Sequence, residues 1–226
     1  MKTTAMARKI PQSKSTSRKL GTKPPKFLII AFCEGKNTEP EYLKSFAKHY
    51  GNGLVRVEPV APAGVPLTVV EKAVTRKKGL DAKKKMDSFD SLYEVWAVFD
   101  RDDHPNISKA IDLARGNNVH TAISNPCIEI WPLLHFTFHR SYIHRHDLQR
   151  ELAKYMASYQ SNGSKLIDYE LIKDNFNYAK SNAESLLADH EATDNPYGNP
   201  STTFYKLLER IIENGIAPKS LQPLVQ

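Results

Sequence analysis

The sequence lacks the features of membrane proteins and of disulfide-stabilised proteins. No apolar run approaches the roughly 20 residues that a membrane-spanning helix needs, and the first residues are not followed by the apolar stretch of a secretory signal. The chain has 2 cysteines, Cys33 and Cys127, which are too few for a disulfide framework or for a cysteine-rich zinc site. These absences predict a cytoplasmic protein in a reducing compartment.

Acidic residues are missing from one end of the chain. Residues 1–26 contain eight lysines and arginines and no aspartate or glutamate, whereas the rest of the chain holds 24 basic and 25 acidic residues. Because residues 1–25 also show no hydrophobic periodicity, we expect a disordered basic tail followed by one domain over residues 26–226. Such a tail either holds nucleic-acid phosphates electrostatically or serves only as a solubilising leader.

Strand-like runs alternate with segments of helical periodicity through the first half of this domain. Strands are predicted at 27–32, 54–59, 94–99 and 119–123. Capping-box spacings at Thr38 and Glu41 and at Thr68 and Glu71 open two of the predicted helices, and others are expected at 107–114 and 128–136. From about residue 145 the pattern is helical only, at 147–159, 168–190 and 200–213. The alternation predicts an α/β domain whose largely parallel sheet is flanked by helices and carries a C-terminal helical extension.

Acidic side chains follow two of the predicted strands at the point where each strand ends. Glu34 follows the first strand, and Asp100 and Asp102 follow the third. Because ligands bind outside the carboxyl ends of the strands in open α/β sheets, we expect these carboxylates to converge and to hold a divalent cation, which relieves their mutual repulsion. Such an ion can activate water at a phosphodiester. The alternative is that Asp102 and Asp103 only cap the next helix.

Other polar residues near the same strand ends are candidates for metal or substrate contacts. Glu129 lies one turn into the helix after Asn125, where it either adds a carboxylate to the metal or interacts with the partial positive charge of the helix N-terminus. Glu39 either lies near the site or simply occupies the first turn of its helix. Asn125 is a candidate for positioning phosphate or water. The remaining candidates for substrate contact are Lys36, Arg101 and His135.

The same segments resemble a known family. Glu34-Gly35 after the first strand and Asp100-Arg101-Asp102 after the third are similar to the topoisomerase–primase (Toprim) fold. More specifically, the chain resembles the RloB family over roughly residues 26–213. The segments that carry this resemblance in combination are 33–39, 42–43, 98–102, 124–131, 133–136 and 199–202.

The resemblance implies a Toprim core with Mg²⁺-dependent nuclease chemistry, in which Mn²⁺ can substitute. It assigns metal binding and general acid or base work to Glu34, and metal ligation to Asp100 and Asp102. Some Toprim nucleases add a catalytic lysine, which cannot be placed in this sequence. The resemblance also implies a bacterial anti-phage effector of the abortive-infection type, with DNA, RNA or tRNA as substrate and an ABC-type ATPase as partner.

Two other functions stay open at the level of the sequence. In a phosphatase, Asp100 would be the nucleophile and Asp102 the acid, but such enzymes normally place this pair on the first strand, and Glu34 would have no role. In a non-catalytic nucleic-acid-binding or sensor subunit, the acidic residues would hold a metal structurally while the basic tail docks nucleic acid.

Overall fold

The computed structural model describes residues 27–86, 92–101, 104–160, 163 and 165–215. The predicted basic tail, Asp102 and Asp103 therefore lie outside the described residues. A five-stranded sheet has the order β2-β1-β3-β4-β5; its strands are β1 (Phe27–Cys33), β2 (Val55–Val60), β3 (Leu92–Asp100), β4 (His120–Asn125) and β5 (Ser201–Thr202). The first four pair in parallel, and β5 runs antiparallel to β4. The predicted α/β fold with a largely parallel sheet is confirmed.

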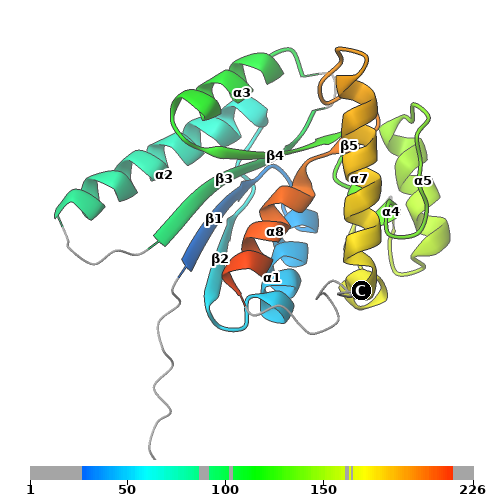
Figure 1. The fold of residues 1–226 in the computed structure, drawn as a ribbon, viewed down its shortest axis with the longest axis horizontal. Helices are drawn as coiled ribbons and strands as arrows, with labels where there is room; N and C mark the ends of the chain where they lie inside the picture. The colour runs from blue at the N-terminus through cyan, green and yellow to red at the C-terminus, as the bar shows by residue number, and fades with distance from the viewer. Residues whose placement is uncertain (1–26, 87–91, 102–103, 161–162, 164, 216–226) are drawn as a thin grey trace, which may run out of the picture.

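Helices cover both faces of this sheet (Figure 1). α2 (Pro66–Met86) and α3 (Ile107–Gly116) pack on one face, and α1 (Thr38–Tyr50) and α8 (Phe204–Asn214) pack on the other. The hydrophobic cluster under α1 and α8 also includes residues of the intervening helical segments. These are α4 (Ile130–Leu133), α5 (Arg145–Tyr155), α6 (Tyr169–Ile172) and α7 (Phe176–Glu191).

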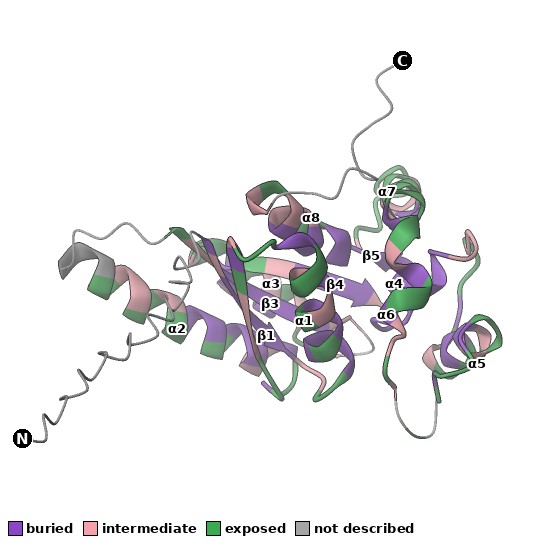
Figure 2. Cartoon of the chain, turned by 90° about the horizontal axis from the view of Figure 1, so that it is seen from below, coloured by how far each residue is buried: buried purple, intermediate pink, exposed green. Residues whose placement is uncertain are grey.

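The central strands are apolar because both of their faces are covered. Ile29 and Ala31 of β1 join the cluster under α1, whereas Ile30 and Phe32 join the cluster under α2 and α3. Successive side chains of a strand point to opposite faces, so a strand between two helical layers needs an unbroken apolar run. Figure 2 shows these strands buried between the two layers. Their carboxyl ends meet at one edge of the sheet, where Glu34 and Asp100 lie.

Both predicted helix starts differ from the structure. α1 begins at Thr38, whose Oγ1 donates instead to the carbonyl of Lys165 (2.9 Å), and the side chain of the preceding Asn37 makes no capping bond. α2 begins at Pro66, before the predicted cap at Thr68. Proline is favoured at the first position of a helix because its missing N–H has no partner there in any case. The two capping-box predictions were therefore wrong, although both helices exist.

The predicted helix at 128–136 contains only one α-helical turn, α4. The N–H groups of Ile130, Trp131, His135 and Phe136 bond to carbonyls three residues back, and Pro132 has no N–H to offer. Such tight turns do not extend into long helices. Further along, the predicted 168–190 helix is divided into α6, a 3₁₀ turn (Lys173–Asn175) and α7, and β5 occupies the start of the predicted 200–213 helix.

Among the described residues, no helix is long and apolar enough to cross a membrane.

Candidate functional site

The ends of β1 and β3 place two of the predicted site residues side by side. β1 and β3 are neighbours in the sheet, with Cys33 paired to Val98. Glu34, one residue after Cys33, and Asp100, two residues after Val98, are joined directly, because the backbone N–H of Asp100 donates to Glu34 Oε2 (3.1 Å). The chain of Glu34 is itself fixed by its own N–H, which donates to the carbonyl of Val98 (3.0 Å). The convergence of Glu34 and Asp100 therefore follows from the parallel register.

Glu39 brings a third carboxylate to this edge. Its side chain, from the first turn of α1, is only 4% exposed and accepts a hydrogen bond from the N–H of Gly35 (3.1 Å). A Cβ atom at Gly35 would lie 2.3 Å from Glu39 Oε2, so the carboxylate packs where a side chain would otherwise stand. The glycine after Glu34 thus makes room for Glu39.

Glu129 supplies a fourth carboxylate to this edge; it lies just before α4 and is only 3% exposed. The hydroxyl of Tyr159 and the side-chain amide of Gln149 both donate to its Oε1. These donors come from the α5 region and hold the carboxylate in place. The buried Glu129 interacts electrostatically with Asp100 and Glu39, so it belongs to the same charged cluster.

Burial and mutual repulsion shape the ionisation of this cluster. Burial raises the pKa of Asp100 well above its usual range, and the negative charges of Glu39, Glu129 and Glu34 raise it further, while Arg145 opposes them. Burial also raises the pKa of Glu39, against the lowering effect of its backbone hydrogen bonds. The four residues Glu34, Glu39, Asp100 and Glu129, here called the carboxylate cluster, are thus under electrostatic strain that a cation relieves.

The donor set fits a hard divalent cation bound mainly by water and substrate. Within the described ranges, no group of three or more His, Cys, Asp or Glu side chains is arranged as a complete metal-binding site; the predicted third ligand, Asp102, lies outside them. Mg²⁺ typically uses only one or two carboxylates and keeps several water ligands. Glu34 and Asp100, linked at the strand ends, satisfy that smaller requirement.

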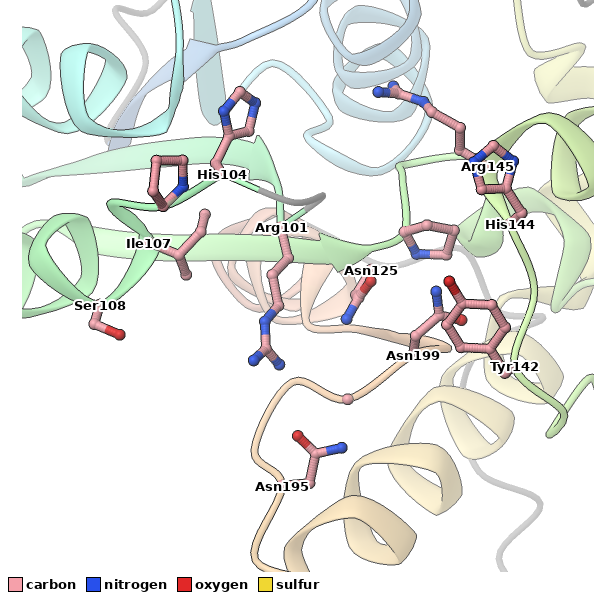
Figure 3. A pocket seen from close by; sticks show the side chains of 13 residues that line it. Arg101, His104, Ile107, Ser108, Asn125, Tyr142, His144, Arg145, Asn195 and Asn199 are labelled. Carbon is pink, nitrogen blue, oxygen red and sulfur yellow. The ribbon is translucent and has the colours of Figure 1, made fainter.

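A polar pocket of about 590 Å³ opens beside the carboxylate cluster. Figure 3 shows His104 and Ile107 on one side of it, Tyr142, His144 and Arg145 on the other, and Arg101 and Asn125 between them. Two of these residues also reach the cluster: Arg145 Nη2 lies 3.6 Å from Asp100 Oδ2, and His104 Nε2 lies 3.7 Å from Glu34 Oε1. A ligand in the pocket would therefore lie next to the carboxylates.

The structure distributes the predicted substrate residues unevenly. Arg101 and Asn125 line the pocket, but both side chains also donate to the carbonyl of Tyr197, which ties them to the pocket wall. Lys36 is exposed on the loop after Glu34. His135 is only 3% exposed, packs edge-on against Trp131 and donates from Nδ1 to the Trp131 carbonyl (2.9 Å), so it is not brought to the pocket.

The sequence analysis missed most of the pocket. Glu39 was left between two alternatives from the sequence, and it lies in the carboxylate cluster rather than in the pocket wall. Tyr142 and Arg145 gave no signal in the sequence, because they lie in the segment before α5 and at its start, far from the strands along the chain. Asn199 lies in the resemblance segment 199–202, but nothing in the sequence placed it beside the first strands. Only the packing of α5 on α4, and the pairing of β5 with β4, bring these residues to the strand ends.

Comparison with known protein families finds that the model described as "RloB-like protein" matches residues 28–211. This range extends from β1 into α8 and confirms the resemblance drawn from the sequence. No curated protein and no solved structure matches the chain.

Proposed function

This chain belongs to the RloB-like protein family, and we propose that it is a divalent-metal-dependent nuclease that hydrolyses phosphodiester bonds of nucleic acid. The resemblance to Toprim proteins provides the expected chemistry. The structure supports the proposal by the placement of the residues that this chemistry requires.

One observation carries the proposal: Glu34 and Asp100 meet at the carboxyl edge of the sheet through the 3.1 Å hydrogen bond between Glu34 Oε2 and the Asp100 N–H. Both are half-buried and lie beside two fully buried carboxylates, Glu39 and Glu129. A buried carboxylate group of this kind is costly unless it is neutralised by protons, paired or bound to metal. Such a group of carboxylates beside an open basic pocket favours a metal-binding function over a purely structural one.

Glu34 and Asp100 would hold the ion, with Asp102 as a further ligand and Glu129 as a charged neighbour. When bound, Mg²⁺ would polarise the scissile phosphate and favour ionisation of an attacking water. Glu34 would accept or return a proton during the displacement. Lys36, Arg101 and Asn125 would bind or position the substrate phosphates, and Arg145 offers a further cation beside Asp100.

The experiment is incubation of the purified chain with single- and double-stranded DNA, total RNA and tRNA in Mg²⁺ or Mn²⁺. We expect cleavage by the wild type and a loss of about 10²- to 10⁴-fold in Glu34→Gln, the range for a general acid or base. Glu41→Gln is the matched control, because Glu41 lies on α1, is 54% exposed and pairs with Lys44; it should cleave as the wild type does. Equal cleavage by Glu34→Gln and the wild type would contradict the proposal.

Metal binding has its own readout. Titration of Mn²⁺ followed by electron paramagnetic resonance should show binding that Asp100→Asn weakens and Glu41→Gln does not. Absence of both cleavage and metal binding in the wild type would favour a non-catalytic nucleic-acid-binding or sensor subunit instead.

We extend the proposal to bacterial anti-phage defence, with an ABC-type ATPase as partner, on the basis of the resemblance alone. A plaque assay in cells that carry the wild type or Glu34→Gln, with and without a neighbouring ATPase gene, tests this. Protection by wild type and not by Glu34→Gln is the expected result.

A further inference from the structure

The pocket beside the carboxylate cluster has the size and lining of a ligand site. Its volume of about 590 Å³ falls within the roughly 300–1,000 Å³ of small-molecule sites. Arginine, histidine and asparagine side chains line it, and none of its described lining residues is acidic. An anion is therefore the ligand that this surface favours, in contrast to the acidic cluster next to it.

The start of α3 adds to this preference. Ile107 and Ser108, the first two residues of α3, line the pocket. The helix has no acidic residue in its first turn and no side-chain cap. The first N–H groups of a helix lack intrahelical partners and carry partial positive charge, which favours a phosphate or carboxylate group.

The wall of the pocket is held in place by bonds between distant segments. Arg101 Nη1 donates to the carbonyls of Pro196 and Tyr197, and Asn125 Nδ2 donates to Tyr197 (2.8 Å). Asn199 exchanges two hydrogen bonds with the backbone of Ile143 (3.1 and 3.0 Å). The shape of the site is thus largely fixed before a ligand binds, which lowers the ordering cost of binding.

An exposed aromatic ring stands at the rim of this fixed wall. Tyr142, next to the anchored Ile143, is 75% exposed, the highest value among the large exposed hydrophobic residues described. It lines the pocket on the same side as His144 and Arg145 (Figure 3). Exposed aromatic rings of this kind serve as platforms for nucleobases, because every base has a flat π-face.

We propose that this pocket binds one unpaired nucleotide of a nucleic-acid strand, with the base against Tyr142 and a phosphate near Arg145 on the same side of the pocket. The α3 N-terminus, on the opposite side, favours a neighbouring phosphate of the strand. The inference rests on the proposed nuclease function and narrows its substrate to single strands, loops or ends. In a duplex each base is stacked and paired, and reaching it requires extrusion at an additional energetic cost. Arg145 and His104 contact both the pocket and the carboxylate cluster, so the bound nucleotide presents its phosphate to the cluster.

The test is fluorescence anisotropy with a labelled oligonucleotide, as a single strand of DNA or RNA and as the matching duplex, in EDTA so that cleavage does not interfere. We expect tighter binding of a single strand than of the duplex. Tyr142→Ala should weaken single-strand binding about tenfold, the typical loss of one stacked base, whereas Tyr142→Phe should stay within about twofold because the ring remains. Tyr178→Ala, which alters a 49% exposed tyrosine of α7 outside the pocket, is the matched control and should bind as the wild type does.

Three results would overturn the inference. The first two are wild-type affinity in Tyr142→Ala and equal affinity of the wild type for duplex and single strands. Adenosine 5′-monophosphate is the probe for a free nucleotide; if it binds more tightly than the strands, the pocket serves a mononucleotide and the strand assignment is wrong. Every variant keeps residues 1–26, so any phosphate binding by the basic tail cancels when a variant is compared with the wild type on the same strand.

The binding assay separates this inference from the nuclease proposal. Tyr142-dependent binding without any cleavage would support the nucleotide pocket and contradict the nuclease. Cleavage that depends on Glu34 but not on Tyr142 would support the nuclease and contradict the nucleotide pocket.

Discussion

The two faces of the sheet are built in different ways. The face under α2 and α3 has an apolar interior, and none of the ten buried polar or charged residues in the described parts of the chain lies on these two helices. The other face, under α1 and α8, includes buried polar groups such as Glu39, Glu129, His135 and Asn182. Most of these groups have identified hydrogen-bond partners, for example Asn182 with the carbonyl of Leu134 (2.9 Å).

The apolar face mainly stabilises the fold, whereas the other face also carries residues of the candidate site. Apolar packing stabilises the face under α2 and α3 with no cost for burying polar groups. The other face incurs that cost and contributes Glu39 and Glu129 to the carboxylate cluster at the sheet edge. Natural proteins break local packing rules mainly where function requires it. We therefore expect substitutions under α2 and α3 to lower stability and leave cleavage unchanged, and substitutions in the carboxylate cluster to lower cleavage without lowering stability.

The largest expected contrast is between Asp100→Asn and Ile30→Val. Asp100→Asn should lower cleavage by at least about a hundredfold, since even partners of metal ligands contribute about 10- to 100-fold. It should also raise Tm at pH 7 without metal, because it removes a charge that burial and neighbouring carboxylates disfavour. Ile30→Val, buried under α2, should lower stability by about 0.5–1.5 kcal/mol and leave cleavage per folded molecule unchanged.

Thermal unfolding in EDTA and the nuclease assay measure both effects. A lower Tm for Asp100→Asn would show that its carboxylate stabilises the fold, and the contrast between the faces would then fail at this residue.

The second contrast is between the pH dependence of stability at His135, on the face under α1 and α8, and that at Ile30, on the opposite face. Burial lowers the pKa of His135 to about 4 in the folded chain, below its ordinary value of 6.5. As the pH falls, the unfolded chain therefore takes up the proton first. The stability that depends on neutral His135 is fully present above pH 6.5 and is lost as the pH falls towards 4, by a total of about 3 kcal/mol.

Urea unfolding at pH 7 and pH 4.5 checks this prediction. The fall in stability between the two pH values should be smaller in His135→Gln than in the wild type, and Ile30→Val should keep the wild-type fall. The raised pKa values of Asp100 and Glu39 act in the opposite direction, because the folded chain retains their protons, so the difference between wild type and variant isolates His135. Equal falls in His135→Gln and the wild type would contradict the assignment.

The smallest contrast compares two glycines. In Gly35→Ala, the new Cβ would lie 2.3 Å from Glu39 Oε2 and displace this carboxylate from its N–H donor, which should destabilise the chain by about 1–3 kcal/mol. Gly79, in α2, has nothing within 4 Å of such a Cβ, so Gly79→Ala should stabilise by about 0.5–1 kcal/mol. Urea midpoints measure both, and a gain in stability for Gly35→Ala would show that Glu39 does not depend on Gly35.

Much of the fold could be predicted from the sequence, because strand and helix periodicity is a local property. The runs that became β1, β2, β3 and β4 were predicted to within two residues at each end, and the parallel sheet followed from their alternation with helices. Helix starts were less predictable: Thr38 has the spacing of a capping box, yet its hydroxyl bonds to Lys165, 127 residues away. A two-residue strand such as β5 is too short to show any periodicity.

The candidate site was predictable in the same uneven way. The joining of Glu34 and Asp100 was predicted because parallel strands end at a common edge, and the role of Asp102 stays a prediction because it lies outside the described residues. Glu39 was left between two alternatives, and its burial beside Gly35 now places it in the carboxylate cluster.

The sequence by itself determined the alternation of strands and helices and the edge at which the acids gather, since these depend on spacings of a few residues. Only the tertiary structure decided which residues surround that edge. Arg145 reaches Asp100 across 45 positions and Arg101 reaches Pro196 across 95, and such contacts form only when the shared core under α1 and α8 packs the distant segments together. Local periodicity contains no information about that packing, because the packing depends on the whole buried surface at once.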